Sequence, residues 1–507
     1  MTTESFSIGR RGLLKGTGGL AATAMLAAPL SMLFAQNASA AGTLGASPYG
    51  PLFPTLDLET GLPLLKLPRD FTYRTMSWRG DMMTNGQPVF PGHDGMGCVA
   101  IGRGRNQRLI LIRNHELGAV REFGLLDAPG TYDTNVRGGS SVPNSGGNSN
   151  IVVSSTGRYI ETQPSLGGTI RNCAGGLTPW GSWLSCEETL DVNSNGGIKH
   201  GYVFEVAADP TQTSGNPIIE MGRMPHEAVA VDPVTGFVYE TEDNRNFAGL
   251  YKFEPTNTSG RVGSLEQGGK LFMAKVVGEN GKLLIAPNLG DSYQLEWVEI
   301  DEPDADPANV SVNEGSVSYS GGASGPFAQG YEKGGLVMSR GEGAWTGPDG
   351  LLYFVDTSAG LDGSNRPGRG EGAVWVYDPR SERLECIYAS QAKVAGNNPD
   401  NITVSPRGGV LLCEDGGGVE DEFGFGERLL GLLPNGQAYP FAKNNIQLSN
   451  SDIAKAGKST SLISEGDYRN IEWAGACFDP TGRILFANTQ TPGITFAISG
   501  PWQRGTL

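Results

Sequence analysis

Short apolar stretches that alternate with turn residues recur along most of the chain. In residues 227–242, two stretches rich in Ala, Val, Tyr and Phe flank the turn sequence DPVTG. Apolar and β-branched runs on either side of a Pro/Gly turn predict the two antiparallel strands of a β-hairpin. Glu227 opens the first of these strands, and Glu242 and Asp243 close the second. The pattern therefore predicts a hairpin with carboxylates at its open end.

The same hairpin, with polar or acidic residues at its ends, returns at intervals along the chain. The copies are residues 94–116, 173–187, 227–242, 342–356, 400–414 and 472–488. Repeated hairpins of this kind predict sheets arranged radially around a central channel. We therefore predict an all-β fold, a six-bladed β-propeller with loop insertions, and expect residues 41–507 to form a single propeller domain. The Gly- and Ser-rich residues 316–330 are expected to be one of the surface loops.

The acids at the hairpin ends have a spatial consequence in such a fold. The start of the first strand and the end of the second lie at the same end of an antiparallel hairpin. A propeller would therefore bring these acids to one mouth of its channel. Carboxylates held that close together cannot all stay ionised unless cations neutralise them. The pattern predicts a multinuclear metal site at this mouth.

The composition agrees with a turn-rich fold that collects cations. The 507 residues include 76 Gly and 31 Pro, and the formal net charge is −16. Many glycines and prolines argue against a helix bundle, and the negative charge disfavours nucleic acid and anionic membranes as partners. The six cysteines are scattered without a CxxC pair, which excludes a zinc ribbon. One or two disulfides remain open at this point.

The N-terminus has the features of an export signal. Arg10 and Arg11 precede an apolar stretch at residues 20–35, and Ala38-Ser39-Ala40 forms a cleavage site. These features predict a twin-arginine signal over residues 1–40, which is read by the twin-arginine export machinery. We expect a folded, periplasmic or secreted protein with no stable membrane insertion after signal removal. A retained N-terminal anchor is the alternative.

Adjacent acids at the ends of second strands are candidate metal ligands. The pairs are Glu187-Glu188, Glu242-Asp243 and Glu414-Asp415. Neighbouring side chains on a strand point to opposite faces, so one acid of each pair is expected to reach a given metal. Carboxylate oxygens suit hard cations such as Ca²⁺, Mg²⁺ or Fe³⁺. The sequence does not say which member of each pair is the ligand.

Two other residues add chemistry to this end of the hairpins. Cys173 occupies a strand-start position, where Glu227 and Glu342 stand in their own repeats. A thiolate there would suit iron better than calcium, and a buried free cysteine is the alternative. Arg340 stands two residues before Glu342 and could clamp a phosphate or carboxylate, or balance the charge of the acids.

Several well-known catalytic motifs do not occur in the chain. A GxSxG elbow, an HExxH motif, a GxxxxGK[ST] loop and a GxGxxG turn in βα context are all missing. Serine-hydrolase, zincin, P-loop and Rossmann hypotheses therefore have no support.

Four segments at the hairpin ends resemble a known family. The segments are NCAGGLTPWGSWLSCEE, PHEAVAVDP, SRGEGAW and DNITVSPRGGVLLCEDG. With the twin-arginine signal, they are similar to the PhoX family of alkaline phosphatases, and the similarity extends over residues 53–497. The resemblance implies a six-bladed propeller that holds Fe³⁺ and Ca²⁺ at its channel mouth and hydrolyses small-molecule phosphomonoesters outside the cytoplasm.

The resemblance also implies roles for single residues. Cys173 would be the thiolate ligand of iron, Glu227 and Glu342 carboxylate ligands of the cluster, and Arg340 the phosphate-holding residue. Either Glu187 or Glu188 would add another ligand. Asp400, Glu414 and Asp415 would be ligands on the calcium side. The last repeat departs from the pattern toward amides, with Asn470 and Asn488 near Glu472.

Two other functions remain compatible with the residues. A calcium-dependent propeller lactonase or esterase would need neither iron nor Cys173, and a non-catalytic periplasmic binding propeller would need no reaction at all. We expect a monomer, since a closed propeller has no sheet edge that a partner must cover.

Overall fold

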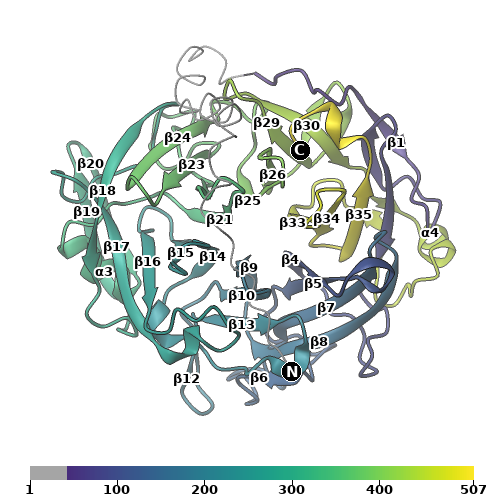
Figure 1. Ribbon diagram of the computed structural model, residues 1–507, viewed down its shortest axis with the longest axis horizontal. Helices are drawn as coiled ribbons and strands as arrows, with labels where there is room; N and C mark the ends of the chain where they lie inside the picture. The colour runs from purple at the N-terminus through teal and green to yellow at the C-terminus, as the bar shows by residue number, and fades with distance from the viewer. Residues whose placement is uncertain (1–42) are drawn as a thin grey trace, which may run out of the picture.

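The structure is a computed structural model that describes residues 43–507. The described chain is all-β, with short helices at the periphery and sheets that surround a common centre (Figure 1). The export signal predicted for residues 1–40 lies outside the described residues.

Six antiparallel hairpins line the centre of the molecule, at the positions that the repeats predict. They are β4 (His93–Ile101) with β5 (Arg108–His115), β9 (Asn172–Leu177) with β10 (Ser182–Glu187), β14 (His226–Val231) with β15 (Val238–Glu242), β21 (Gly341–Thr346) with β22 (Leu352–Asp356), β25 (Pro399–Val404) with β26 (Val410–Glu414), and β33 (Trp473–Phe478) with β34 (Ile484–Thr489). Each first strand contacts the first strand of the next hairpin, and β33 contacts β4. The first strands therefore form a closed ring.

Outer strands extend these hairpins into five larger sheets. A five-stranded sheet adds β7 (Gly146–Ser154), β8 (Tyr159–Thr169) and β6 (Gly130–Thr131) to β4 and β5, and a three-stranded sheet adds β13 (Val203–Ala207) to β9 and β10. A nine-stranded sheet runs β14-β15-β16-β17-β18-β24-β23-β22-β21, with β16 (Leu250–Pro255), β17 (Gly269–Val276), β18 (Ser292–Glu299), β23 (Ala373–Asp378) and β24 (Arg383–Ala389). A six-stranded sheet adds β29 (Arg428–Leu432), β30 (Ala438–Asn444), β2 (Leu65–Pro68) and β1 (Leu52–Thr55) to β25 and β26, and a four-stranded sheet adds β35 (Ile494–Ser499) and β3 (Thr72–Met76) to β33 and β34.

The prediction of six separate blades is corrected by these sheets. Four sheets have four or more strands, and their arrangement is propeller-like. The sheet of β9 and β10 stops at three strands. Two other hairpins share one nine-stranded sheet, because β18 pairs with β24 along their outer edges. Such pairing joins the backbone groups of two edge strands, and a repeat pattern in the sequence does not predict it.

Segments from both ends of the described chain close the ring. Strand β3 pairs with β35 in the last sheet, and β1 and β2 extend the sheet of β30. In Figure 1 the purple N-terminal strands accordingly lie beside the yellow C-terminal ones. Backbone pairing between segments so distant in sequence ties the start of the domain to its end.

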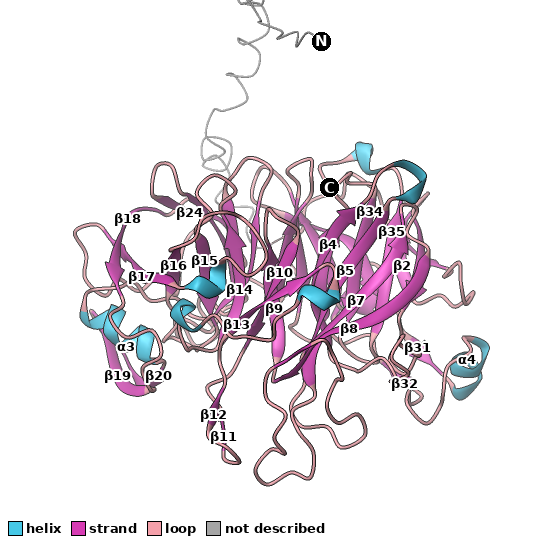
Figure 2. Ribbon diagram, turned by 60° about the horizontal axis from the view of Figure 1, so that its bottom comes forward, coloured by secondary structure: helices cyan, strands magenta, loops and turns pink. Residues whose placement is uncertain are grey.

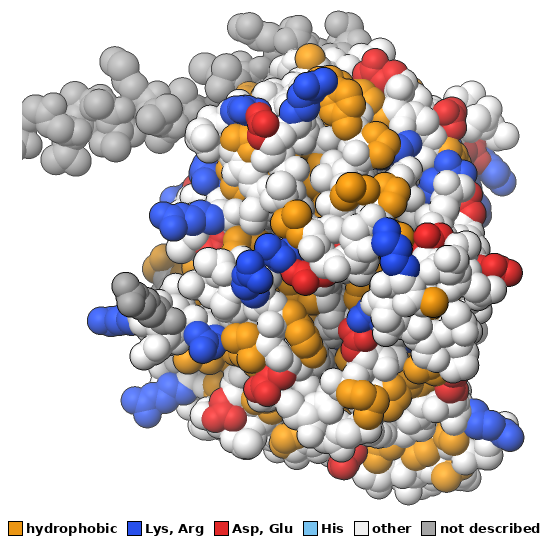
Figure 3. All heavy atoms as spheres, turned by 90° about the vertical axis from the view of Figure 1, so that its right-hand side faces the viewer, with side chains coloured by type: hydrophobic (Ala, Val, Ile, Leu, Met, Phe, Trp, Pro, Cys, Tyr) orange, Lys and Arg blue, Asp and Glu red, His pale blue; other side chains and the backbone are white. Residues whose placement is uncertain are grey.

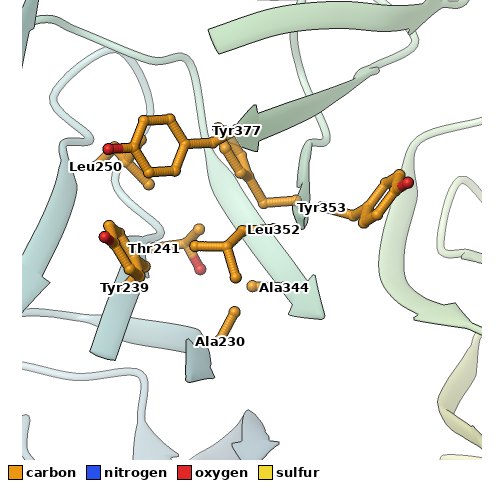
Figure 4. A pocket seen from close by; sticks show the side chains of 9 residues that line it. Ala230, Tyr239, Thr241, Leu250, Ala344, Leu352, Tyr353 and Tyr377 are labelled. Carbon is orange, nitrogen blue, oxygen red and sulfur yellow. The ribbon is translucent and has the colours of Figure 1, made fainter. Parts of the chain in front are cut away.

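Small residues near the centre and aromatic residues farther out fill the space between neighbouring hairpins. Between the hairpins that begin with β14 and β21, Ala230 and Ala344 come from the first strands, while Tyr239 and Tyr377 come from strands farther out (Figure 4). A radial arrangement leaves a wedge-shaped gap between sheets, and this gradation of side-chain size fits the taper.

Insertions between hairpins carry most of the remaining structure. They contain four two-stranded ribbons: β11 (Val192–Asn193) with β12 (Ile198–Lys199), β19 (Ala308–Glu314) with β20 (Val317–Ala323), β27 (Val419–Asp421) with β28 (Gly424–Gly426), and β31 (Gln447–Leu448) with β32 (Gly466–Asp467). The helices α3 (Gly325–Glu332) and α4 (Asn450–Lys455) lie at the periphery (Figure 2). The prediction that residues 316–330 form a loop is therefore wrong: they contain all of β20 and most of α3, and α3 begins where Ser324 caps the backbone N–H of Phe327.

Three global properties bear on the predictions. All six cysteines are free and buried, so the open question of disulfides is answered in the negative. Within residues 43–507, no helix is long and apolar enough to cross a bilayer. On the outer face in Figure 3, Lys and Arg side chains are interspersed with Asp and Glu, whereas many carboxylates are buried in the interior.

Candidate metal and phosphate site

A β-bulge interrupts the pairing of every inner hairpin, at the start of its first strand. The register shifts lie at His93/Met96, Asn172/Gly175, His226/Val229, Gly341/Ala344, Pro399/Asn401 and Ala474/Cys477. A bulge frees one residue from the ladder and redirects its side chain. The residues at this position are Asp94, Cys173, Glu227, Glu342, Asp400 and Gly475. Five of the six therefore carry a group that can bind a metal.

The ring of first strands brings four of these side chains into direct proximity. Single ligand atoms of Glu227, Glu342 and Asp400 lie within 4.8 Å of one another, and so do those of Cys173, Glu188 and Glu227. Glu227 belongs to both groups, so the two groups form one cluster. The prediction that positions far apart in the chain meet at one place agrees with this geometry.

Burial and mutual repulsion dominate the electrostatics of the cluster. Burial, followed by the charge of Asp400, raises the pKa of Glu227 well above its ordinary value, and burial and Asp243 do the same for Glu342. Burial and Asp243 raise the pKa of Glu188 to about 9. Buried carboxyls this close hold protons at neutral pH unless a cation replaces those protons.

Further acids widen the cluster into a ring. Burial, Glu116 and Asp400 raise the pKa of Asp94, while burial, Asp415 and Asp94 raise that of Glu472. Burial and Asp400 raise the pKa of Asp415 to about 6. Asp94, Glu116 and Glu472 were not among the candidate ligands, although they stand at hairpin ends, whereas Asp243 was a candidate only as a member of the Glu242-Asp243 pair. Gly475 leaves one position of the ring without a side chain.

The structure does not bring Glu187 into this cluster. Its carboxylate accepts hydrogen bonds from the backbone N–H of Ile170 and of Gly201, both at 2.9 Å, and lies 2.7 Å from Nδ1 of His200. Glu188, the next residue, is the one that reaches Cys173 and Glu227. Of the two alternatives left open by the sequence, the geometry selects Glu188.

Glu414 is likewise held outside the cluster, which corrects its expected place on the calcium side. Both of its oxygens bind Arg428, at 2.7 Å each, and one also accepts from the backbone N–H of Asn397 at 2.7 Å. The following residue, Asp415, takes part in the ring. In both pairs, the last residue of the second strand therefore fixes nearby loops, and the residue after it faces the carboxylate cluster.

Arg340 lies against the cluster. Its Nε donates to Asp243 at 2.7 Å, its Nη2 also binds Asp243, and Nη2 lies 2.9 Å from Oε1 of Glu342. The side chain is 29% exposed. The backbone N–H of Arg340 donates to Asp356 at 3.0 Å, which fixes the chain on which the guanidinium stands. A second arginine, Arg171, binds Glu188 at 2.5 Å.

The histidines at hairpin ends have structural surroundings. Nε2 of His226 lies 3.0 Å from the carbonyl oxygen of Gly222, and its Nδ1 faces Glu240 at 3.3 Å. His115 lies between the carbonyl of Pro91 and the hydroxyl of Ser149. Both rings are fully buried, and neither belongs to the cluster.

Comparison with known proteins adds to this geometry. Residues 47–493 match the family model described as alkaline phosphatase PhoX. The chain belongs to this family. As a PhoX-family member it is a phosphoric monoester hydrolase, of a family that is typically periplasmic or extracellular. The family predicted from the four sequence segments is confirmed.

Solved structures show the same fold for a PhoX protein. The structure of Pseudomonas fluorescens PhoX in complex with vanadate, a transition state analogue, superposes with a TM-score of 0.60 at 16% identity, covering 92% of this chain and 99% of that one. The gluconolactonase XC5397 from Xanthomonas campestris (TM-score 0.33, 11% identity, 89% of this chain and 98% of that one) is far less similar. The search of curated protein sequences gave no match.

Proposed function

We propose that this PhoX-family phosphatase uses an iron and calcium cluster, held by Cys173, Glu188, Glu227, Glu342 and Asp400, to release phosphate from small phosphoesters. The observation that carries the proposal is the pair of overlapping ligand groups within 4.8 Å, joined by Glu227. In this assignment Glu227 bridges a thiolate-containing group and an all-carboxylate group.

The donor set fits these ions. A thiolate among carboxylates suits iron, and three carboxylates suit Ca²⁺, which prefers several oxygen ligands. Oε1 of Glu342 is buried and, among the described residues, accepts no well-aligned hydrogen bond, although Arg340 is near it. Burial and repulsion also raise the pKa of the Cys173 thiol, so a cation is needed to keep it ionised.

When bound, such cations would neutralise the phosphoryl oxygens and stabilise the charge of the transition state. The chain's own contribution is to position the substrate. Asp243 holds Nε and Nη2 of Arg340, while Nη1 has no partner among the residues that the structure describes. This leaves one edge of the guanidinium to donate to a phosphoryl oxygen beside the cluster. Asp243 thus orients the arginine rather than contacting the substrate.

The larger-scale parts of the proposal rest on the fold and the family. We infer that the six inner hairpins surround one channel, in a propeller-like arrangement whose outer strands do not form six separate sheets. Residues 41–507 would be one catalytic domain that works as a monomer. Residues 1–40 would direct its export in the folded state by the twin-arginine route, which suits a protein that acquires its metals before export.

Elemental analysis combined with a phosphatase assay tests the proposal. The Glu342→Gln variant should lose calcium and at least about tenfold in kcat on p-nitrophenyl phosphate, since it removes a ligand oxygen's charge. Glu299→Gln, an exposed acid on β18, serves as the control. Wild-type metal content and activity in Glu342→Gln would reject the assignment. If the wild-type protein contains calcium but no iron, and the Cys173→Ala variant stays active, the iron site is rejected.

A further inference from the structure

A polar pocket lies beside the cluster, between loops at the same end of the hairpins. It is lined by Arg245, Ser358, Asp362, Arg366, Arg369, Gly370, Glu371, Lys393 and Asn398. These residues come from the loops after β15, after β22 and before β25. All three loops join strands at the end where the metal ligands stand, so pocket and cluster share one face of the ring.

The pocket is positively charged within a strongly negative protein. Its lining carries four basic and two acidic side chains. Arg366 is paired with Asp362, and its Nη2 lies 2.6 Å from the carboxylate. Among residues 43–507, Arg245, Arg369 and Lys393 have no carboxylate partner within 4 Å. Glu371 is the one acid of the lining that forms no ion pair among the described residues, so three basic side chains are balanced by a single carboxylate. The whole chain has a net charge of −16, so the excess of positive charge in this pocket runs against the charge of the protein.

Direct contacts connect the pocket to the phosphate-holding arginine. Asn398, in the pocket wall, donates to the carbonyl of Thr357 at 2.8 Å, and the N–H of Thr357 donates to the carbonyl of Arg340. Arg245 lies near enough to both Arg340 and Arg369 that, after burial, their charges lower its pKa. Arg245, in the pocket lining, is therefore within electrostatic range of both Arg340 and Arg369.

The two loops that carry Arg245 and Arg369 are held in place by hydrogen bonds. Nη1 of Arg245 donates to the carbonyl of Gly368 at 3.2 Å, and the N–H of Asn398 donates to the carbonyl of Glu371. These bonds tie the three loops together across the pocket. The arrangement thus resembles a preformed site more than a set of independent surface cations.

We propose that this basic pocket, formed around Arg245, Arg369 and Lys393, binds a second anionic group of the substrate while the ester phosphate occupies the cluster. The preferred substrates would be small phosphoesters that carry another phosphate or a carboxylate. The proposal rests on the proposed function, because it assigns the place of the ester phosphate to the metal ligands and Arg340. Unpaired guanidinium and ammonium groups provide the hydrogen-bond donors that such an anion requires.

The test compares two substrates that differ in one charged group, 3-phosphoglycerate and glycerol 3-phosphate. The readout is the ratio of their kcat/KM values, measured on the metal-loaded enzyme. In the double variant Arg369→Gln/Lys393→Gln, this ratio should fall by about threefold to tenfold, as expected for two exposed charge contacts. The wild-type ratio should also fall as salt is raised to about 0.5 M, because exposed charges are screened.

Lys270→Gln, which removes one positive charge from the outer strand β17, is the control and should leave the ratio unchanged. An unchanged ratio in the double variant, or an equal loss on both substrates, would overturn the proposal. If the wild type does not hydrolyse p-nitrophenyl phosphate, the proposed function fails separately. The pocket is then judged by calorimetric binding of the same two compounds, and equal affinity for both would reject it.

Discussion

Glu187 and Glu188 are neighbours in the chain, yet their carboxylates have different environments. Glu187 is surrounded by donors from Ile170, His200 and Gly201, whereas Glu188 faces Cys173 and Glu227. Hydrogen bonds from backbone N–H groups stabilise an ionised carboxylate, and neighbouring carboxylates destabilise it. A shift of one residue along the chain therefore separates Glu187, whose carboxylate stabilises the fold, from Glu188, whose ionised carboxylate requires a nearby cation.

Exchanging each of these two acids for its amide should separate stability from metal binding. Glu187→Gln should lower the free energy of unfolding by about 1–3 kcal/mol, because an amide cannot accept all of the donors around it. Metal content per folded molecule should stay the same. Glu188→Gln should instead reduce metal content and kcat, with a smaller effect on the metal-free protein. Urea unfolding and elemental analysis measure both, and the opposite assignment of effects would contradict this division of roles.

In five of the six inner hairpins, the bulge is the element that turns a candidate metal-binding side chain out of the strand pairing. Neighbouring first strands must also approach closely if these side chains are to meet. At Gly343, directly after Glu342, a Cβ atom would lie 2.8 Å from Cα of Asn401 and 2.8 Å from the carbonyl oxygen of Asp400. Only glycine allows β21 and β25 to approach this closely, and the approach is what brings Glu342 and Asp400 together.

Gly343→Ala should therefore damage both stability and the metal site. The added methyl group must push β21 and β25 apart, at a cost of about 1–3 kcal/mol. The separation of Glu342 and Asp400 should increase, so calcium content should fall. Gly322→Ala in β20, where no atom lies within 4 Å of the built Cβ, is the matched control. Thermal unfolding and calcium analysis measure the two effects. Wild-type stability and calcium content in Gly343→Ala would contradict the prediction, because they would show that β21 and β25 can accommodate the methyl group.

The whole molecule holds a crowded set of acids at the centre of a closed ring. Strands from both ends of the described chain hold that ring shut, through β3 on β35 and β2 on β30. The ring cannot expand to relieve repulsion between the acids without breaking these sheets. The repulsion is therefore relieved by protons or by cations, and the stability of the metal-free protein should depend on pH.

Chelation should produce a protein whose melting temperature falls as pH is raised from 7 to 9. Burial and Asp243 raise the folded-state pKa of Glu188 to about 9, from an ordinary value of 4.5. Between those values the folded state binds a proton that the unfolded state has released, so stability decreases as pH rises. Burial lowers the folded-state pKa of His115 to about 3. This histidine makes stability rise with pH, but only below its ordinary pKa of about 6.5, so it does not affect the range from pH 7 to 9.

Differential scanning fluorimetry with and without EDTA measures this dependence. The metal-loaded protein should show a shallower slope over the same range, since bound cations replace the protons. The slope after chelation should also decrease in Glu188→Gln, which removes one of the titrating groups. A melting temperature that rises with pH after chelation would be incompatible with the repulsion described here.

Much of the fold and of the site could be predicted because both follow from local patterns. Apolar runs around Pro/Gly turns located all six inner hairpins, and strand-start positions identified Cys173, Glu227, Glu342 and Asp400. The choice of Glu188 over Glu187 could not be predicted, because it depends on which face of the strand end turns toward the ring. The additional acids at Asp94 and Glu472 were visible in the hairpin pattern but lacked a spatial partner to identify them.

The order of apolar, turn and acidic residues was by itself enough to determine the hairpins and the common end at which the acids stand, and the resemblance of four segments indicated the family. Tertiary structure alone decided how the outer strands join into sheets, which acid of each adjacent pair faces the metal ligands, and where Arg245, Arg369 and Lys393 come together. The physical reason is that a hairpin forms from contacts within a short stretch of chain. The ring, its bulges and the basic pocket depend on distances between stretches that meet only after the fold has closed.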